Sequence, residues 1–146
     1  MGEGLVTQME LMYGMHATVV ADIVPGRATE VLASAGVDAA DIVTTDDADE
    51  AVAAHDAGKR VATTNIDNAW AAPVDTTVEA TGIPEVGARV AHDAIEAAKH
   101  VLQMNVETDA TVGYVLRKKA REAGVVYTLT AGDEPGTTME LYDFAV

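Results

Sequence analysis

The same pattern of residues recurs at four places in the sequence. A helical segment ends, a Gly or Ala follows, and a run rich in Val, Ile or Leu begins, in "ASAGVDAADIV", "HDAGKRVAT", "IEAAKHVLQM" and "REAGVVYTL". Glycine after the last helical residue supplies the left-handed conformation that ends a helix. Three of the junctions have it, at Gly36, Gly58 and Gly124, and Ala98 takes that place in the fourth, at modest cost or with a different cap. Short apolar strands that alternate with helices predict a parallel sheet covered on both faces, with right-handed crossovers.

We therefore expect an α/β fold with a doubly wound parallel sheet, formed by all 146 residues as one domain. Only 4% of the residues are aromatic although 49% are hydrophobic, so the core has to be built from Ala, Val, Ile, Leu and Met. Strands are expected at 16–22, 42–44, 59–63, 74–80, 100–107 and 125–131. Helices are expected at 2–13, 25–35, 46–58, 65–70, 84–98, 109–124 and 137–146.

Charge and composition exclude several classes of function. The formal net charge of −15 repels a phosphate backbone and leaves no basic stripe, so nucleic acid is not an expected partner. The chain has no cysteine, hence no disulfide and no thiolate metal site, which favours the cytoplasm. No run approaches the roughly 18 apolar residues of a membrane span, and no signal peptide is recognisable, so no membrane association is expected.

The opening residues, "MGEGLVTQ", place a Gly-x-Gly at the start of a helix without a strand before it. In a dinucleotide-binding unit a strand runs into G-x-G-x-x-G, and an acidic residue about 20 positions later binds the ribose hydroxyls. Gly2 would be the third glycine of that pattern, and Asp22 ends the next strand at the right separation. On spacing alone the alternative stays open, because aspartates at strand ends also form turns and helix caps.

Three segments resemble a known family: "MGEGLVTQMELMYGMHATVVADIVPGRA", "EATGIPEVGARVAHDAIEAAKHVLQMNVETDATVG" and "GVVYTLTAGDEPG". They are similar to the NAD(P)-binding, Rossmann-like domain of homoserine dehydrogenase-like oxidoreductases. The branch they resemble is the one like deoxyxylulose-phosphate reductoisomerase, which often carries a C-terminal SAF domain. The resemblance implies that the chain is truncated at both ends, without the first strand of its sheet and without the downstream catalytic domain.

The resemblance assigns cofactor-binding roles to residues after the strands. Asp22 would accept from the hydroxyls of the adenosine ribose, which favours NAD. Arg27 would meet a 2′-phosphate and allow NADP, or it is a solvated residue at a helix start. Thr81 and Gly82, in "EATG", would bring backbone close to the nicotinamide side, and otherwise form a strand-to-helix turn.

Two further polar segments follow strands. Asn105 and Glu107, in "MNVE", would face the nicotinamide ribose or the substrate, and Glu107 could also cap the next helix. Asp133 and Glu134, in "AGDEPG", form a carboxylate pair before a Pro-Gly turn that we interpret as a hinge. The acidic run at 46–50 is explained by a helix N-terminus, and the scattered histidines indicate no metal site.

The leading hypothesis is the cofactor-binding domain of an NAD(P)-dependent oxidoreductase, which transfers hydride to or from a small carbonyl or hydroxyl substrate in an intact enzyme. Dinucleotide and small-molecule substrate would be its partners, and the fragment alone would be inactive. The alternative is a non-catalytic Rossmann-like nucleotide-binding or structural fragment. Because a missing strand leaves unpaired backbone groups on its neighbours, we also expect a homo-oligomer.

Overall fold

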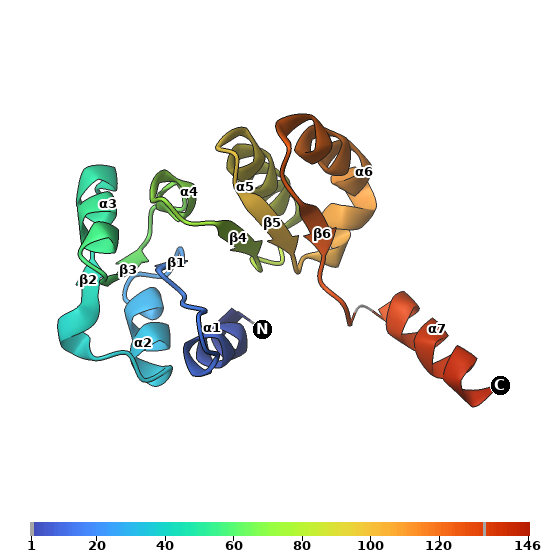
Figure 1. Cartoon of the computed structure of the whole chain (residues 1–146), viewed down its shortest axis with the longest axis horizontal. Helices are drawn as coiled ribbons and strands as arrows, with labels where there is room; N and C mark the ends of the chain where they lie inside the picture. The colour runs from blue at the N-terminus through green and yellow to red at the C-terminus, as the bar shows by residue number, and fades with distance from the viewer. Residues whose placement is uncertain (1, 133) are drawn as a thin grey trace. The chain divides into compact units, whose positions relative to one another are not determined.

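A computed structural model describes residues 2–132 and 134–146, apart from the side chains of residues 134–136. The chain forms two compact units, unit 1 at Met1–Asp75 and unit 2 at Thr76–Val146 (Figure 1). Each unit contains a three-stranded sheet whose strands are all parallel. The expected α/β class with flanking helices is confirmed, and its strands are divided between two sheets.

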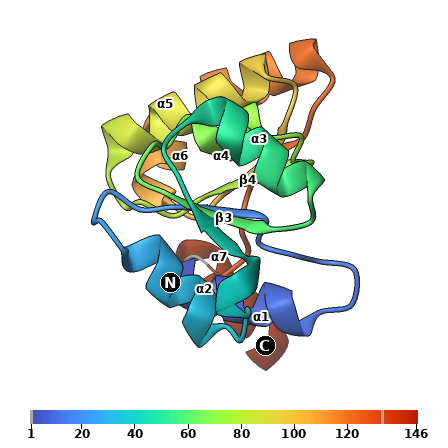
Figure 2. The ribbon, with the colours of Figure 1, turned by 90° about the vertical axis from the view of Figure 1, so that its left-hand side faces the viewer.

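Unit 1 has helices on both faces of its sheet, whose strand order is β1-β3-β2. Alternate residues of β3 point to opposite faces. Val61 packs with α3, while Ala62 packs with α1 and α2. Figure 2 shows α3 on one side of β3 and the other two helices on the opposite side. The elements in chain order are α1 (Gly2–Leu11), β1 (Val19–Ala21), α2 (Arg27–Ser34), the 3-10 turn η1 (Ala39–Asp41), β2 (Ile42–Thr44), α3 (Ala48–Asp56), β3 (Arg60–Thr63) and α4 (Asn68–Ala71).

Unit 2 packs two long helices on each other and on a sheet of order β4-β5-β6. Its core contains Ile95 from α5, Leu116 from α6, and Val101 and Tyr127, which are paired in the sheet register. The elements are β4 (Thr76–Glu79), α5 (Pro84–Glu96), β5 (His100–Gln103), α6 (Val106–Ala123), β6 (Tyr127–Leu129) and α7 (Glu134–Ala145).

The helix ends lie at the Gly and Ala positions that the sequence predicted. Gly36, Gly58 and Gly124 have φ angles of 93°, 74° and 74°, and Ala98 has a φ of 57°. The three glycines are therefore left-handed, as predicted, and Ala98 has the same conformation rather than a different cap. Ala98 adopts this conformation against the steric preference of its Cβ.

The structure corrects two boundaries near predicted site residues. The strand expected at 100–107 ends at Gln103, and Glu107 lies in the first turn of α6. The helix begins early because the Asn105 side chain accepts a hydrogen bond from the Thr108 backbone N–H and caps it. The turn expected in "AGDEPG" is also different: residues 134–136 belong to α7, and Asp133 lies outside the described residues.

Within the described part of the chain, none of the helices combines the length and the apolar character that crossing a membrane requires.

Candidate functional site

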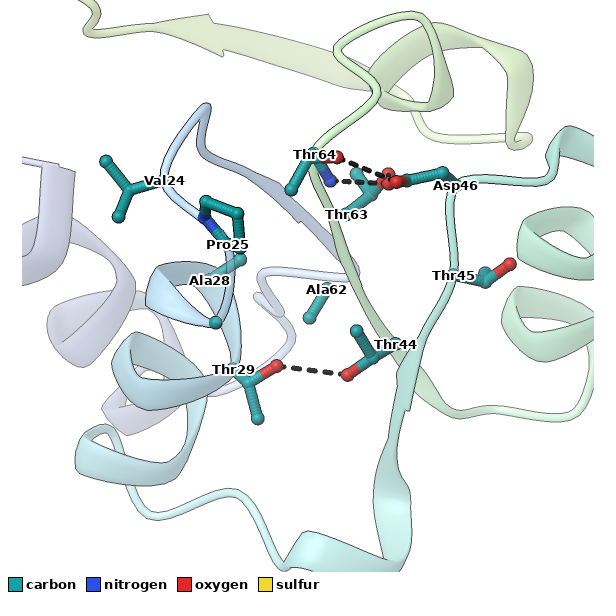
Figure 3. A pocket seen from close by; sticks show the side chains of 11 residues that line it. Val24, Pro25, Ala28, Thr29, Thr44, Thr45, Asp46, Ala62, Thr63 and Thr64 are labelled. Carbon is teal, nitrogen blue, oxygen red and sulfur yellow. Dashed lines mark hydrogen bonds between the residues drawn. The ribbon is translucent and has the colours of Figure 1, made fainter.

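Unit 1 contains a cavity of about 330 Å³ at the carboxyl ends of its strands. Open α/β sheets bind ligands at this edge, because the loops that follow parallel strands meet there. Small-molecule sites typically have volumes of roughly 300–1,000 Å³, so this one is of nucleoside rather than dinucleotide size. Its lining combines apolar groups with threonine hydroxyls and one carboxylate: Val24, Pro25, Gly26, Ala28, Thr29, Thr44, Thr45, Asp46, Ala62, Thr63 and Thr64 (Figure 3).

Asp46 is the one titratable side chain among these lining residues. Its Oδ1 accepts from the Thr63 hydroxyl and from the backbone N–H groups of Thr64 and Asn65, at 2.9, 2.6 and 3.1 Å. Its Oδ2 accepts from the Thr64 hydroxyl at 2.7 Å. The bonds from Thr64 contribute most to a lowering of the Asp46 pKa to about 2, because they stabilise the ionised form. The cavity therefore carries a fixed negative charge at neutral pH.

The sequence prediction missed this role of Asp46. The acidic run was expected to serve a helix N-terminus, and Asp47 does cap α3 by accepting from the Glu50 N–H. Asp46, one residue earlier, instead holds the turn after β3. A signal was present, because the last residues of β2 and β3 begin the polar triplets "TTD" and "TTN" at the carboxyl ends of adjacent strands.

None of the three predicted residues of unit 1 lines the cavity. Asp22 directly follows β1, its N–H donates to the Thr63 carbonyl, and its Oδ1 accepts from the Val24 N–H at 2.8 Å. Arg27 begins α2 and donates to Glu3 Oε2 at 3.0 Å, with Glu30 3.9 Å away. Gly2 begins α1, next to Glu3. The Glu3–Arg27 pair thus ties the start of α1 to the start of α2.

The four predicted residues of unit 2 come from two neighbouring strand ends. Thr81 and Gly82 form an exposed turn after β4, and Gly82 has a left-handed φ of 73°. Asn105 is buried as the cap of α6, and Glu107 is exposed on its first turn. Since β4 and β5 are paired in the sheet, these segments follow adjacent strands of one sheet edge.

Beneath the Thr81 turn lies a buried polar cluster that the sequence did not reveal. Glu79, the last residue of β4, is 1% exposed, and Gln103, Asn105 and Thr108 are buried beside it. Glu79 Oε1 accepts from the N–H and the hydroxyl of Thr81, at 2.7 and 2.5 Å. Its Oε2 accepts from Gln103 Nε2 at 2.5 Å. Two polar atoms of the cluster, Gln103 Oε1 and Asn105 Nδ2, make no hydrogen bond.

Gly87 of α5 makes room for this cluster. A Cβ at position 87 would lie 2.4 Å from Thr108 Oγ1 and 2.7 Å from Glu79 Oε2. Both distances are far below van der Waals contact. The close approach of the α5 backbone therefore requires glycine here.

In the part of the chain that the structure describes, no three histidine or acidic side chains lie close enough together to hold a metal ion. The chain has no cysteine that could take part in such a site.

Comparison with known proteins assigns no family to the chain. No family model matches it, and no curated protein gives a significant match.

Proposed function

We propose that the chain is the cofactor-binding part of an NAD(P)-dependent oxidoreductase, in which unit 1 binds the adenosine half of the dinucleotide. The observation that carries this proposal is the cavity at the carboxyl ends of β1, β3 and β2. Its apolar walls suit a purine ring, and its threonine hydroxyls offer hydrogen bonds to polar edges. Asp22 follows β1 at the same sheet edge, where an acid binds ribose hydroxyls in dinucleotide-binding folds.

Within unit 2 alone, the residues after β4 and β5 are proposed to contact a nicotinamide group. Gly82 permits close approach of backbone to a ligand because it has no Cβ. Glu107 is exposed and supplies a polar group at these strand ends, where the backbone of Thr81 and Gly82 would approach the ligand. The hydride chemistry belongs to the cofactor and its substrate, a small carbonyl or hydroxyl compound.

The charges around the unit 1 cavity favour NAD over NADP. The Arg27 guanidinium is engaged by Glu3 and Glu30, and Asp46 places a carboxylate in the cavity wall. A 2′-phosphate would therefore meet more negative than positive charge. We therefore expect NAD(H) to bind more tightly than NADP(H).

The same cavity supports binding rather than chemistry. Its one titratable lining group, Asp46, keeps its charge down to a pH of about 2 and cannot exchange a proton near neutrality. The chain alone is therefore expected to bind dinucleotide without oxidising NADH or NADPH in the presence of a small carbonyl compound. The proposed location of the protein is the cytoplasm, which the lack of cysteine supports.

Titration calorimetry of the full chain with NAD⁺, NADH, NADP⁺ and NADPH tests the proposal. We expect a dissociation constant below about 1 mM, which corresponds to about 4 kcal/mol of binding free energy. The Asp22→Ala variant should lose at least tenfold in affinity for NADH. Absence of binding by all four dinucleotides would leave the chain as a structural fragment.

Asp38→Ala is the matched control. The Asp38 side chain accepts from a backbone N–H two residues on at 2.8 Å, as the Asp22 side chain does. It precedes β2 and so lies at the opposite end of the strands from the cavity. Its removal should affect stability as much as Asp22→Ala and leave dinucleotide affinity unchanged. Equal losses of affinity in both variants would show that Asp22 acts only through the fold.

A further inference from the structure

Glu79 is a buried carboxylate that the proposed cofactor site does not itself use. It is 1% exposed, and its hydrogen-bond donors are the neutral groups of Thr81 and Gln103. Among the residues that the structure describes, it forms no ion pair. A carboxylate buried without a cation destabilises a fold unless its hydrogen bonds compensate for the lost hydration. The burial of Glu79 therefore calls for an explanation other than a contribution to stability.

The turn that follows β4 depends on this carboxylate. Residues 80–83 are all exposed, so apolar packing does not fix the turn. Both bonds from Thr81 go to a single oxygen of Glu79, and bonds to an ionised acceptor are about twice as strong as neutral ones. The other oxygen is bonded to Gln103 at the end of β5. Glu79 thus joins the turn to the neighbouring strand.

We propose that Glu79 is the positioning residue of the unit 2 site, which holds the Thr81–Gly82 turn in the conformation that receives a dinucleotide. This inference rests on the proposed function. Fixing the turn before binding lowers the entropy cost of ordering it around a ligand. Glu79 contacts no ligand itself, because it is covered by the turn and by the neighbouring helices.

The surrounding atoms show why Glu79→Gln is an informative change. The amide has the shape of the carboxylate, and its oxygen can still accept from Thr81. Gln103 Oε1 has no hydrogen bond, so its amide can turn over and accept from the new Nε2. The link between β4 and β5 then persists, while the bonds to Thr81 lose their charge. The weaker bonds to Thr81 lower the stability of the variant, and the removal of a buried charge raises it. We therefore expect the variant to be as stable as the unchanged chain.

Three measurements on the Glu79→Gln chain test the proposal. Hydrogen exchange of the Thr81 amide, followed by NMR, should become at least tenfold faster, while that of the Val101 amide in β5 stays unchanged. The dissociation constant for NADH should rise at least tenfold. The urea midpoint should not change. The control is Glu85→Gln, which removes one exposed carboxylate four residues beyond Thr81 and should alter none of the three.

Substitutions at Thr81 test the same link from its other end. Thr81→Val removes the hydroxyl and should weaken NADH binding, whereas Thr81→Ser keeps the hydroxyl and should restore it. In the Glu79→Gln, Thr81→Val double variant the losses should not add fully, because both single changes weaken the same contact between Glu79 and Thr81.

Each contrary result has a distinct meaning. Unchanged exchange at Thr81 in Glu79→Gln overturns the positioning role. A lower urea midpoint, with faster exchange at Thr81 and Val101 together, overturns it in favour of a purely structural role. If the unchanged chain binds no NADH, the proposed function and the ligand named here are both overturned, while the exchange of Thr81 still decides whether Glu79 holds the turn.

Discussion

Ala98 lies just after the end of α5 and has a φ of 57°, a conformation that costs a residue with a Cβ about 1–2 kcal/mol. Glycine has no such cost, although its unfolded state is more flexible. We therefore expect Ala98→Gly to raise the free energy of unfolding by about 0.5–1 kcal/mol, measured by urea denaturation. Ala97→Gly is the matched control, because Ala97 has a φ of −80°. It should lower the free energy of unfolding by a similar amount, and an equal effect of both variants would contradict the argument.

Gly87→Ala tests the close packing around the buried cluster. The added methyl group would collide with Thr108 Oγ1 and Glu79 Oε2, both of which are held in the interior. Overpacking of this kind costs about 1–3 kcal/mol, which urea denaturation can measure. Gly4→Ala in α1 is the control, since a Cβ there meets nothing within 4 Å. That change should stabilise the chain by up to about 1 kcal/mol, because alanine favours helix.

The pH dependence of stability should contain a contribution from Asp46. Its pKa is about 2 in the folded chain, compared with 3.8 for an aspartate without these hydrogen bonds, so folding favours the ionised form. The resulting stability is fully present above pH 3.8 and is lost as the pH falls toward 2. In the Asp46→Asn variant, the urea midpoint should fall less between pH 4 and pH 2 than it does in the unchanged chain. A parallel decline in both proteins would contradict this assignment.

At the scale of elements, α1 is attached to the start of β3 through Glu10. This carboxylate accepts from Arg60 Nη2 at 3.0 Å and from the Ala17 N–H at 2.8 Å, and its side chain is 10% exposed. Burial raises the pKa of Glu10, but the hydrogen bonds from Arg60 and Ala17 and the charge of Arg60 outweigh it, so the pKa lies below 4.5. This stabilisation is present above pH 4.5 and is lost as the pH falls below it.

Glu10→Gln should therefore detach α1 partly from the sheet. Hydrogen bonds to charged groups contribute about 1.5–3 kcal/mol each, and we expect a loss of about 2 kcal/mol at pH 7. Hydrogen exchange should become faster in α1 than in α3, which packs on the other face. The control is Glu30→Gln, because Glu30 is exposed and lies 3.9 Å from Arg27. A uniform rise in exchange over unit 1 would contradict a local role.

The elements could be predicted because their signals are local. Apolar runs and the residues at 36, 58, 98 and 124 mark helix ends within a few positions. The candidate site was only partly predictable, because its main contacts join distant residues. Asp46 and Thr64 are 18 positions apart, and Glu79 and Gln103 are 24 apart. The sequence places polar residues after strands, but it does not say which of them turn inward and bind each other.

At the scale of the whole molecule, α7 offers an apolar surface that unit 2 leaves exposed. Its side chains from 138 to 145 are all exposed, including Leu141 at 65% and Phe144 at 92%. An isolated helix of this length is marginal in water, so contact with another surface would stabilise α7. We propose that a second copy of the chain supplies this surface, which would make the protein a homo-oligomer.

Light scattering coupled to gel filtration tests this proposal. The mass should exceed that of one chain, and the excess should grow with added salt, because each copy carries a net charge of −15 that salt screens. The Leu141→Gln, Phe144→Gln double variant should elute as a monomer, since it removes the apolar surface of α7. Tyr114→Gln, which changes an exposed aromatic residue of α6, should still self-associate. A monomer at all protein and salt concentrations in the unchanged chain would contradict the proposal, and α7 would then have to be covered by a different molecule or lose its helical structure.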